Sequence, residues 1–98
     1  MTTTILLLSV DEAPMLEHSL PAALAQGPDS EVVVVDNASA DGTAELTRRL
    51  GARHLRLERR VCYAAAVNAA VAQTGGEAVL LLNADCFLEP GFVDAVVA

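Results

Sequence analysis

Two stretches of the sequence combine the signal of a buried strand with an abrupt polar end. Residues 31–42 read EVVVVDNASADG, and residues 79–86 read VLLLNADC. A short, continuous apolar run is typical of a strand covered on both faces, as in a parallel sheet. In both stretches the run stops at Asn and Asp, where the strand should end. The chain therefore places polar groups at strand ends. Whether these strand ends lie together depends on the order of the strands and helices along the chain.

Helical patterns separate the strand-like segments along the whole chain. Leu16, Leu20 and Leu24 recur at a spacing of four and predict the buried stripe of a first helix, with Asp11 as its N-cap. Pro21 costs about 3 kcal/mol inside an ordinary helix, so we expect a kink or a late start. The predicted order is strand 5–10, helix 11–26, strand 32–35, helix 41–51, edge strand 54–58, helix 63–73, strand 78–82 and a helix starting near 90.

Regular alternation of strands and helices predicts an α/β domain, a Rossmann-like open parallel sheet with flanking helices and right-handed crossovers. With 98 residues the chain makes one domain, and it is shorter than most complete enzymes of this class. The carboxyl ends of parallel strands share one edge, and ligands bind there, where the strand order reverses. The polar residues that should meet at this edge are Asp11, Asp36, Asn37, Arg59, Arg60, Asn83 and Asp85.

Charge and composition exclude several classes of function. Thirteen acidic residues against six Arg give a net charge of −7, which opposes binding to a nucleic-acid backbone. The N-terminal residues carry no signal peptide and no membrane span, so we expect a cytoplasmic protein. Cys62 and Cys86 are too few for a disulfide framework and too few for a zinc site, which predicts two reduced thiols.

The carboxylates at the predicted edge suit a hard divalent cation. Magnesium and manganese prefer oxygen ligands and commonly bridge a protein carboxylate and a diphosphate, a role open to Asp36 and Asp85. A purely structural interpretation remains open for residues 36–39, which can form a turn in which Ser39 or Asp41 caps the next helix. The chain contains no glycine-rich phosphate loop.

Two further polar features of the sequence are also open to two interpretations. Arg59 and Arg60 either meet a diphosphate or form a solvated face. Asn68, polar on an Ala- and Val-rich helix, either bonds a loop backbone or faces the ligand cleft.

The stretches EVVVVDNASADGTAEL and YAAAVNAAVAQTGGEAVLLLNADCFLEPGFV resemble the amino-terminal half of family 2 glycosyltransferases, especially the rhamnosyltransferase-like branch. The resemblance implies a GT-A-type fold with strand order 3-2-1-4. It also implies transfer of a sugar from a nucleoside diphosphate sugar to an acceptor hydroxyl, with Mg²⁺ or Mn²⁺ stabilising the leaving diphosphate. The residues that match substrate-binding positions of the family are Ser9, Asp11, Asp36, Asn37, Asn68 and Asn83, and the residue that matches the metal ligand is Asp85. We add Arg60 to the predicted substrate-binding residues, because it can meet a diphosphate.

Three departures from the family pattern qualify these expectations. Val10-Asp11 stands where the family usually has Tyr-Asn, which removes a ring that could stack on the base. Arg60-Val61-Cys62-Tyr63 replaces the common Asn-x-Gly-Phe, and Cys in place of Gly restricts the backbone. The sequence also lacks the region that supplies the acceptor site and catalytic base in the family. We therefore expect a domain that binds a donor and, by itself, does not turn it over.

Two other functions are compatible with the sequence. A receiver-like or flavodoxin-like binding module would place paired acids after the first strand, as Asp11-Glu12 does, but would need an Asp where the third strand ends in Glu58-Arg59. Alternatively, the chain is a structural fragment whose last strand, residues 78–82, is an unpaired edge. Such an edge favours either a homodimer or aggregation.

Overall fold

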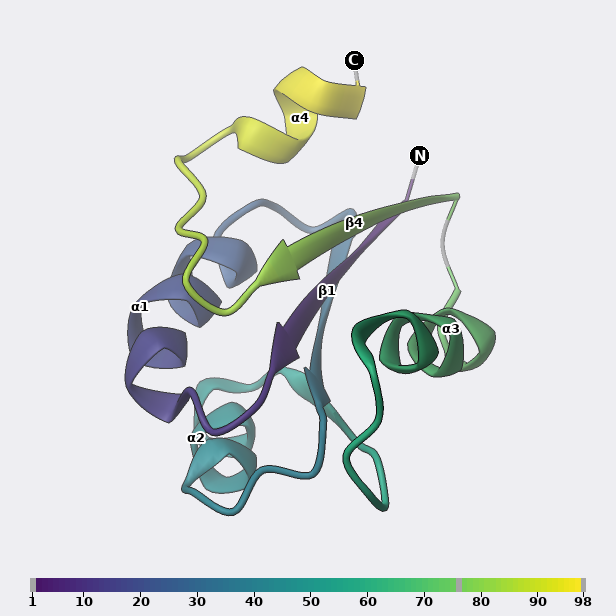
Figure 1. Cartoon of the computed structure of the whole chain (residues 1–98). Coiled ribbons are helices and arrows are strands. Elements are labelled where there is room, and N and C mark those ends of the chain that lie inside the picture. Colours follow the sequence, from purple (N-terminus) through teal and green to yellow (C-terminus); the bar gives the residue numbers. More distant parts are fainter. Residues whose placement is uncertain (1, 76, 98) are drawn as a thin grey trace.

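The computed structural model describes residues 2–75 and 77–97. It contains the predicted alternation of strands and helices (Figure 1). The elements are β1 (Thr3–Ser9), α1 (Ala13–Leu24), β2 (Ser30–Asp36), α2 (Thr43–Leu50), β3 (Arg53–Arg56), α3 (Tyr63–Gln73), β4 (Ala78–Asn83) and α4 (Phe92–Val97). The four strands pair in parallel in the order β3-β2-β1-β4. The predicted fold class and strand order are therefore confirmed.

The two faces of the sheet carry separate apolar clusters because successive strand residues point to opposite sides. Ile5 and Leu7 of β1 pack with Val32 and Val34 of β2 in the cluster that also contains buried residues of α1 and α2. The alternate residues of the same strands pack with Ala66 and Ala70 of α3. Figure 1 shows α1 and α2 on one face of the sheet and α3 on the other. Both central strands are thus covered on both faces, as their continuous apolar runs predict.

Helix α1 differs from its sequence-based prediction in three details. Its N-cap is Glu12 and not Asp11. The helix starts at Ala13 and continues through Pro21, so the late start is wrong. Leu24 is exposed, and Ala23 is the buried residue of the last turn. Pro21 has no N–H to donate to the carbonyl oxygen of Glu17. Because Glu17 and Pro21 are both exposed, water can donate to this oxygen instead.

Helix α2 ends at Gly51, as the sequence predicts. Gly51 has a φ of 84°, and its N–H bonds the carbonyl oxygens of Thr47 and Arg48. This left-handed conformation is open to glycine at little steric cost, so it closes the helix and turns the chain into β3.

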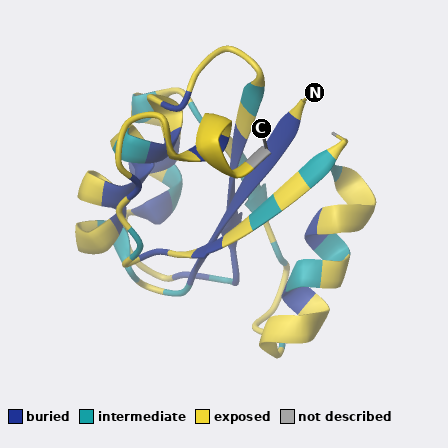
Figure 2. Cartoon of the chain, turned by 90° about the horizontal axis from the view of Figure 1, so that it is seen from above, coloured by how far each residue is buried: buried dark blue, intermediate teal, exposed yellow. Residues whose placement is uncertain are grey.

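Strand β4 forms one edge of the sheet, and α3 leaves part of its surface uncovered. Val79 and Leu81 lie opposite Thr4 and Leu6 of β1, which places them on the α3 face of the sheet. They are 43% and 41% exposed, respectively, and Figure 2 shows exposed segments along β4 and α3.

Buried Gln26 fastens the segment that follows β4. Its Nε2 donates to the carbonyl oxygen of Glu89 at 2.9 Å, and its Oε1 accepts from the N–H of Val93 at 2.9 Å. The start of α4 is thereby tied to the end of α1. Among the described residues, every helix is too short or too polar to cross a bilayer.

Candidate functional site

A cavity of about 440 Å³ lies at the carboxyl edge of the sheet. The strand order reverses between β1 and β4, because the chain moves outward through β2 and β3 and then returns to the other side of β1. Residues from the ends of β1 and β4 line this cavity, and the loops after β2 and β3 complete its wall. It is therefore at the position where open parallel sheets bind ligands, and its size is that of a small-molecule site. The predicted site residues that line it are Ser9, Asn37, Arg60, Asn83 and Asp85.

Asn37 and Ser9 differ in whether the protein already satisfies their side-chain hydrogen bonds. Asn37 bonds both main-chain groups of Val61, donating from Nδ2 at 2.8 Å and accepting at Oδ1 at 3.0 Å. Its amide therefore fixes the loop before α3 as a cavity wall. Ser9 is 2% exposed, and its hydroxyl has no hydrogen-bond partner among the described residues. A buried hydroxyl without a partner is costly unless something else bonds it.

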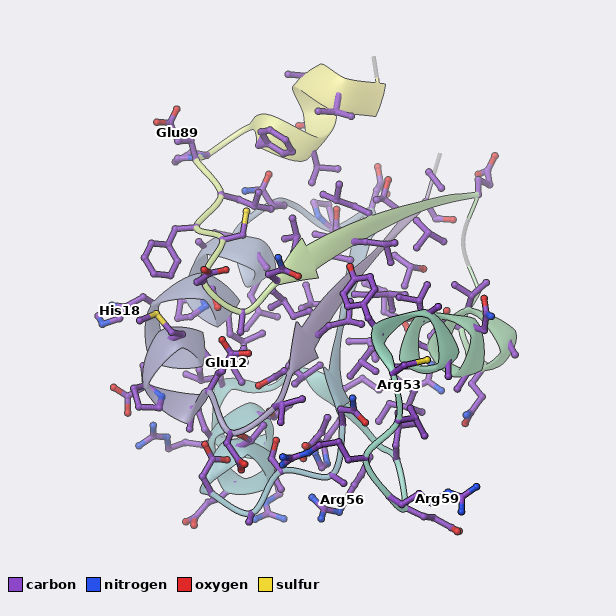
Figure 3. All side chains as sticks on the ribbon, in the orientation of Figure 1. Glu12, His18, Arg53, Arg56, Arg59 and Glu89 are labelled. Atoms are coloured by element: carbon purple, nitrogen blue, oxygen red, sulfur yellow. The ribbon has the colours of Figure 1, made fainter. Side chains whose placement is uncertain are left out.

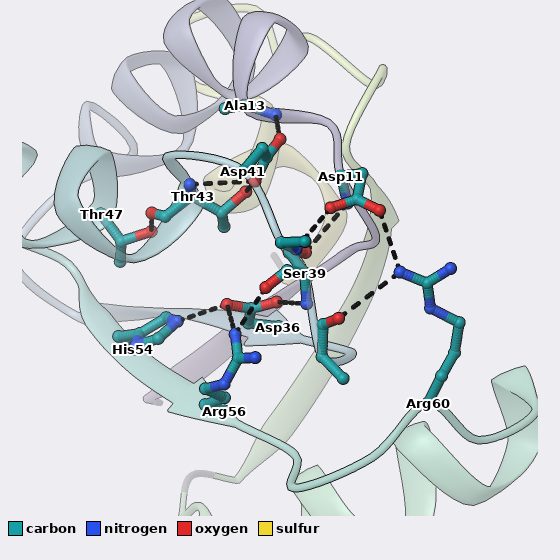
Figure 4. Close-up of polar contacts among 12 residues, drawn as sticks. Asp11, Ala13, Asp36, Ser39, Asp41, Thr43, Thr47, His54, Arg56 and Arg60 are labelled. Atoms are coloured by element: carbon teal, nitrogen blue, oxygen red, sulfur yellow. Dashed lines mark hydrogen bonds and ion pairs between the residues drawn. The ribbon is translucent and has the colours of Figure 1, made fainter.

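Asp36 is fully buried beneath the cavity edge and does not line the cavity. Its Oδ1 accepts the N–H of Ser39 at 2.8 Å, and its Oδ2 lies 2.8 Å from Nε2 of His54 and 3.3 Å from Nη1 of Arg56 (Figure 4). An ionised carboxylate only accepts, so Nε2 of His54 carries the proton in this contact. Arg56 also donates to the carbonyl oxygen of Ser39 at 2.8 Å. The structure thus gives Asp36 a role in shaping the loop, and its predicted role in substrate binding stays a prediction.

The surroundings of Asp36 favour its charged form. Burial by itself would raise the pKa of this carboxyl, but hydrogen bonds from Ser39 and His54 outweigh burial and hold the pKa below its usual value of 3.8. The network is therefore built around a carboxylate and not around a carboxylic acid.

Asp11 joins three loops at the rim of the cavity. Its N–H donates to Oγ of Ser39 at 2.9 Å, its Oδ1 accepts from the N–H of Ala40 at 2.6 Å, and its Oδ2 accepts from Nη2 of Arg60 at 2.9 Å (Figure 4). Asp11 itself does not line the cavity. Its φ is 51°, a conformation that Asp tolerates better than most residues. Residues from two of the three departures from the family pattern, Asp11 and Arg60, thus meet as an ion pair.

The remaining predicted residues lie away from the cavity. Asn68 is exposed on α3 and is not part of the cavity wall, so its role in binding stays a prediction. Arg59 points outward from the tip of the loop before α3 (Figure 3), in contrast to its neighbour Arg60. Cys62 and Cys86 are both free thiols, as expected.

Four polar residues at or near the site were not predicted. Glu12 and Tyr63 line the cavity, and His54 and Arg56 bond Asp36. Figure 3 shows Glu12 at the start of α1. The position of Glu12 after the first strand could have suggested its place at the edge, whereas the role of His54 depends on the β2–β3 register, which pairs Arg56 with Asp36.

The carboxylates in the cavity wall fit a divalent cation that is bound partly by a ligand. Asp85 and Glu12 both line the cavity, with the amide of Asn83 beside them. Residues 2–75 and 77–97 contain no group of three or more His, Cys, Asp or Glu side chains arranged to hold a metal ion. Mg²⁺ is typically bound through one or two carboxylates together with substrate phosphates and water, so this donor set suits a cation that arrives with a diphosphate.

The parallel sheet and its edge cavity define an α/β domain of the GT-A type, and comparison with known proteins supports this class. Residues 4–98 match the family described as glycosyl transferase family 2. The chain belongs to this family. This match favours the transferase over the receiver-like module that the sequence left open.

Several relatives and solved structures are similar to the chain. Uncharacterized glycosyltransferases of Mycobacterium tuberculosis and Mycobacterium bovis are 39% identical over 83 residues, covering 84% of this chain and 38% of theirs. A mannosyltransferase of Pyrobaculum calidifontis, solved in complex with GDP-Man and Mn²⁺, superimposes with a TM-score of 0.85 at 31% identity and covers 95% of this chain and 30% of its own. TarS of S. aureus in complex with UDP-GlcNAc has a TM-score of 0.84 at 23% identity, covers 99% of this chain and 30% of its own, and shares the fold.

The chain spans 38% of the length of its curated relatives and about 30% of the solved structures above. The described structure therefore corresponds to one part of these longer proteins.

Proposed function

We propose that the cavity binds the nucleoside diphosphate part of a sugar donor together with Mg²⁺ or Mn²⁺, for transfer of the sugar to an acceptor hydroxyl. The observation that carries this proposal is the position of the cavity at the reversal of strand order, where Asn83 of β4 and Asp85 just after it line the same cavity as Ser9 and Asn37. The Pyrobaculum mannosyltransferase, which has the same fold, was solved with a nucleotide sugar and Mn²⁺. This supports a donor of the same chemical class.

Each polar group in the cavity wall has a proposed role in binding. We assign Asp85 as the protein ligand of the metal, and Glu12, which lines the same cavity, as a candidate second carboxylate. A bound divalent cation would neutralise the charge that develops on the leaving diphosphate. The Ser9 hydroxyl, which has no hydrogen-bond partner among the described residues, is assigned to the nucleoside, and Asn37 holds the Val61 main chain against the ligand.

We propose that turnover requires groups in addition to those around the cavity. Among residues 2–75 and 77–97, no His lines the cavity, and the two carboxylates that line it are those assigned to the metal. We propose that the acceptor site and the general base come from the remaining part of the longer proteins, so that this chain alone binds the donor and does not transfer the sugar.

Titration calorimetry tests the proposed binding. We expect UDP, GDP or their sugar conjugates to bind the 98-residue chain in the presence of Mn²⁺ or Mg²⁺, and more weakly in EDTA. Asp85→Asn should weaken metal-dependent binding by about tenfold or more, since one charge-assisted contact contributes about 1.5–3 kcal/mol. Asp94→Asn on α4, outside this cavity, is the matched control and should bind normally. Absence of binding by the unmodified chain, or unchanged affinity in Asp85→Asn, would contradict the proposal.

A further inference from the structure

We infer that Asp11 and Arg60 act as one unit in which Asp11 holds the Arg60 guanidinium at the cavity and Arg60 binds the diphosphate of the donor. This inference rests on the proposed function and deepens it. It assigns the positive charge that faces the diphosphate and makes Asp11 a positioning residue, in place of the predicted direct contact of Asp11 with the ligand.

Asp11 is placed to orient Arg60 because the protein holds both of its carboxylate oxygens. Oδ1 accepts from the N–H of Ala40 and Oδ2 accepts from Arg60, while the Asp11 N–H donates to Ser39. These hydrogen bonds hold the loop after β1 against the loop after β2 independently of Arg60. The guanidinium binds to a carboxylate whose own position is already fixed.

The ion pair contributes little to the stability of the fold. The side chains of Arg60 and Asp11 are 55% and 41% exposed, respectively. Exposed pairs of this kind typically contribute about 0–1 kcal/mol, because solvent screens the charges and two side chains lose freedom. The main effect of the ion pair is therefore to fix the position of the Arg60 guanidinium at the cavity.

Arg60 retains donors for a ligand while it is held. Its Nη2 bonds Asp11 at 2.9 Å and lies 3.4 Å from the carbonyl oxygen of Ala38. Its Nε and Nη1 make no hydrogen bond to the described residues. A guanidinium carries five N–H donors in a planar fork that matches phosphate oxygens, so the remaining donors suit a diphosphate.

The charges around the cavity favour a role for Arg60 in binding an anionic ligand. Arg60 is the one cationic side chain among the described residues of the cavity wall, which also carries Glu12 and Asp85. The two positive charges of a divalent metal would balance the negative charges of Glu12 and Asp85. Arg60 is then the protein side chain among the described wall residues that can balance the negative charge of the diphosphate. An Arg fixed before binding also loses less side-chain freedom when the ligand arrives.

A double-mutant cycle tests the coupling. Arg60→Gln should weaken binding of UDP and GDP by about tenfold, the effect of losing one charge-assisted contact, and should leave binding of uridine and guanosine, measured by NMR titration, unchanged. Asp11→Asn should weaken diphosphate binding by about threefold. The double variant should bind no more weakly than Arg60→Gln, because Asp11 acts only through Arg60. The adjacent, outward-pointing Arg59 provides the matched control Arg59→Gln, which should bind like the unmodified chain.

The outcomes separate this inference from the proposed function. If the unmodified chain binds no nucleotide, both fail. If it binds UDP or GDP and Arg60→Gln binds equally well, or loses nucleoside and diphosphate affinity alike, the inference fails and the proposed function stands. Additive losses from the two substitutions would overturn the coupling. Circular dichroism checks that each variant is folded, and Arg60→Lys, which keeps the charge without the fork, should recover only part of the affinity.

Discussion

Among the individual residues, Asp36 shows that an acid at the end of a buried strand can stabilise a loop and need not contact a ligand. An acid directly after a buried strand was expected to face the ligand, but the carboxylate is fully buried and bonded by Ser39, His54 and Arg56. A sequence specifies that Asp36 ends a strand. It does not specify which partners arrive from β3, because those depend on strand register and side-chain orientation.

The Asp36 network makes a prediction about stability and pH. Because the pKa of Asp36 in the folded chain lies below 3.8, its contribution to stability is present above that pH and is lost as the pH falls through the folded-state pKa. Asp36→Asn should lower the free energy of unfolding at neutral pH by about 1–3 kcal/mol, since a buried charged acceptor is lost. Urea unfolding followed by circular dichroism measures this.

The difference in stability between Asp36→Asn and the unmodified chain should narrow as the pH falls below about 3.8. Asp29→Asn provides a control, because Asp29 is exposed and its side chain makes no hydrogen bond to the described residues. Equal stability of Asp36→Asn and the unmodified chain at neutral pH would show that the network is dispensable.

At the scale of elements, Asp41 links the starts of two helices. Its Oδ2 accepts from the N–H of Ala13 at the start of α1 at 3.0 Å, and its Oδ1 accepts from the N–H of Thr43 at the start of α2 at 3.0 Å (Figure 4). Its Oδ1 also accepts from the hydroxyl of Thr43. The sequence predicts the local cap of α2, since Asp41 lies two residues before Thr43. The cap of α1 joins residues 28 positions apart and follows only from the folded loops.

Removing this shared cap should destabilise the domain more than removing an ordinary one. A single cap contributes about 0.5–2 kcal/mol, so Asp41→Ala should lower the free energy of unfolding by about 1–3 kcal/mol. Asp41→Asn retains one side-chain acceptor and should lose less. Chemical unfolding followed at 222 nm compares the three proteins. A loss equal in both variants would mean that charge, and not the acceptor geometry, is what stabilises the helix starts.

At the scale of the whole molecule, the order of elements was the most predictable property. Alternating strands and helices with right-handed crossovers restrict the chain to few topologies, and the family resemblance selects among them the observed order β3-β2-β1-β4. The cavity position at the carboxyl edge follows from that order. Its detailed wall does not, because Glu12 and Tyr63 enter it through the path of loops that no periodic pattern specifies.

The exposed edge strand β4 leads to a prediction about association. We propose that a second copy of the chain pairs along β4, since Val79 and Leu81 are exposed beside its free edge. The weight-average mass from light scattering should then rise with concentration, and Leu81→Lys should reduce this rise. Val96→Lys on α4, also an exposed apolar position, should have no effect. A constant monomer mass for the unmodified chain over the accessible concentrations would contradict the pairing.

NMR mapping of bound UDP or GDP with Mg²⁺ shows directly whether the cavity at the ends of β1 and β4 is the nucleotide site. We expect the largest amide shifts at Ser9, Asn37, Val61, Asn83 and Asp85. Shifts clustered in the groove between α1 and α2, around Glu17 and Arg49, with none at the carboxyl edge, would contradict it.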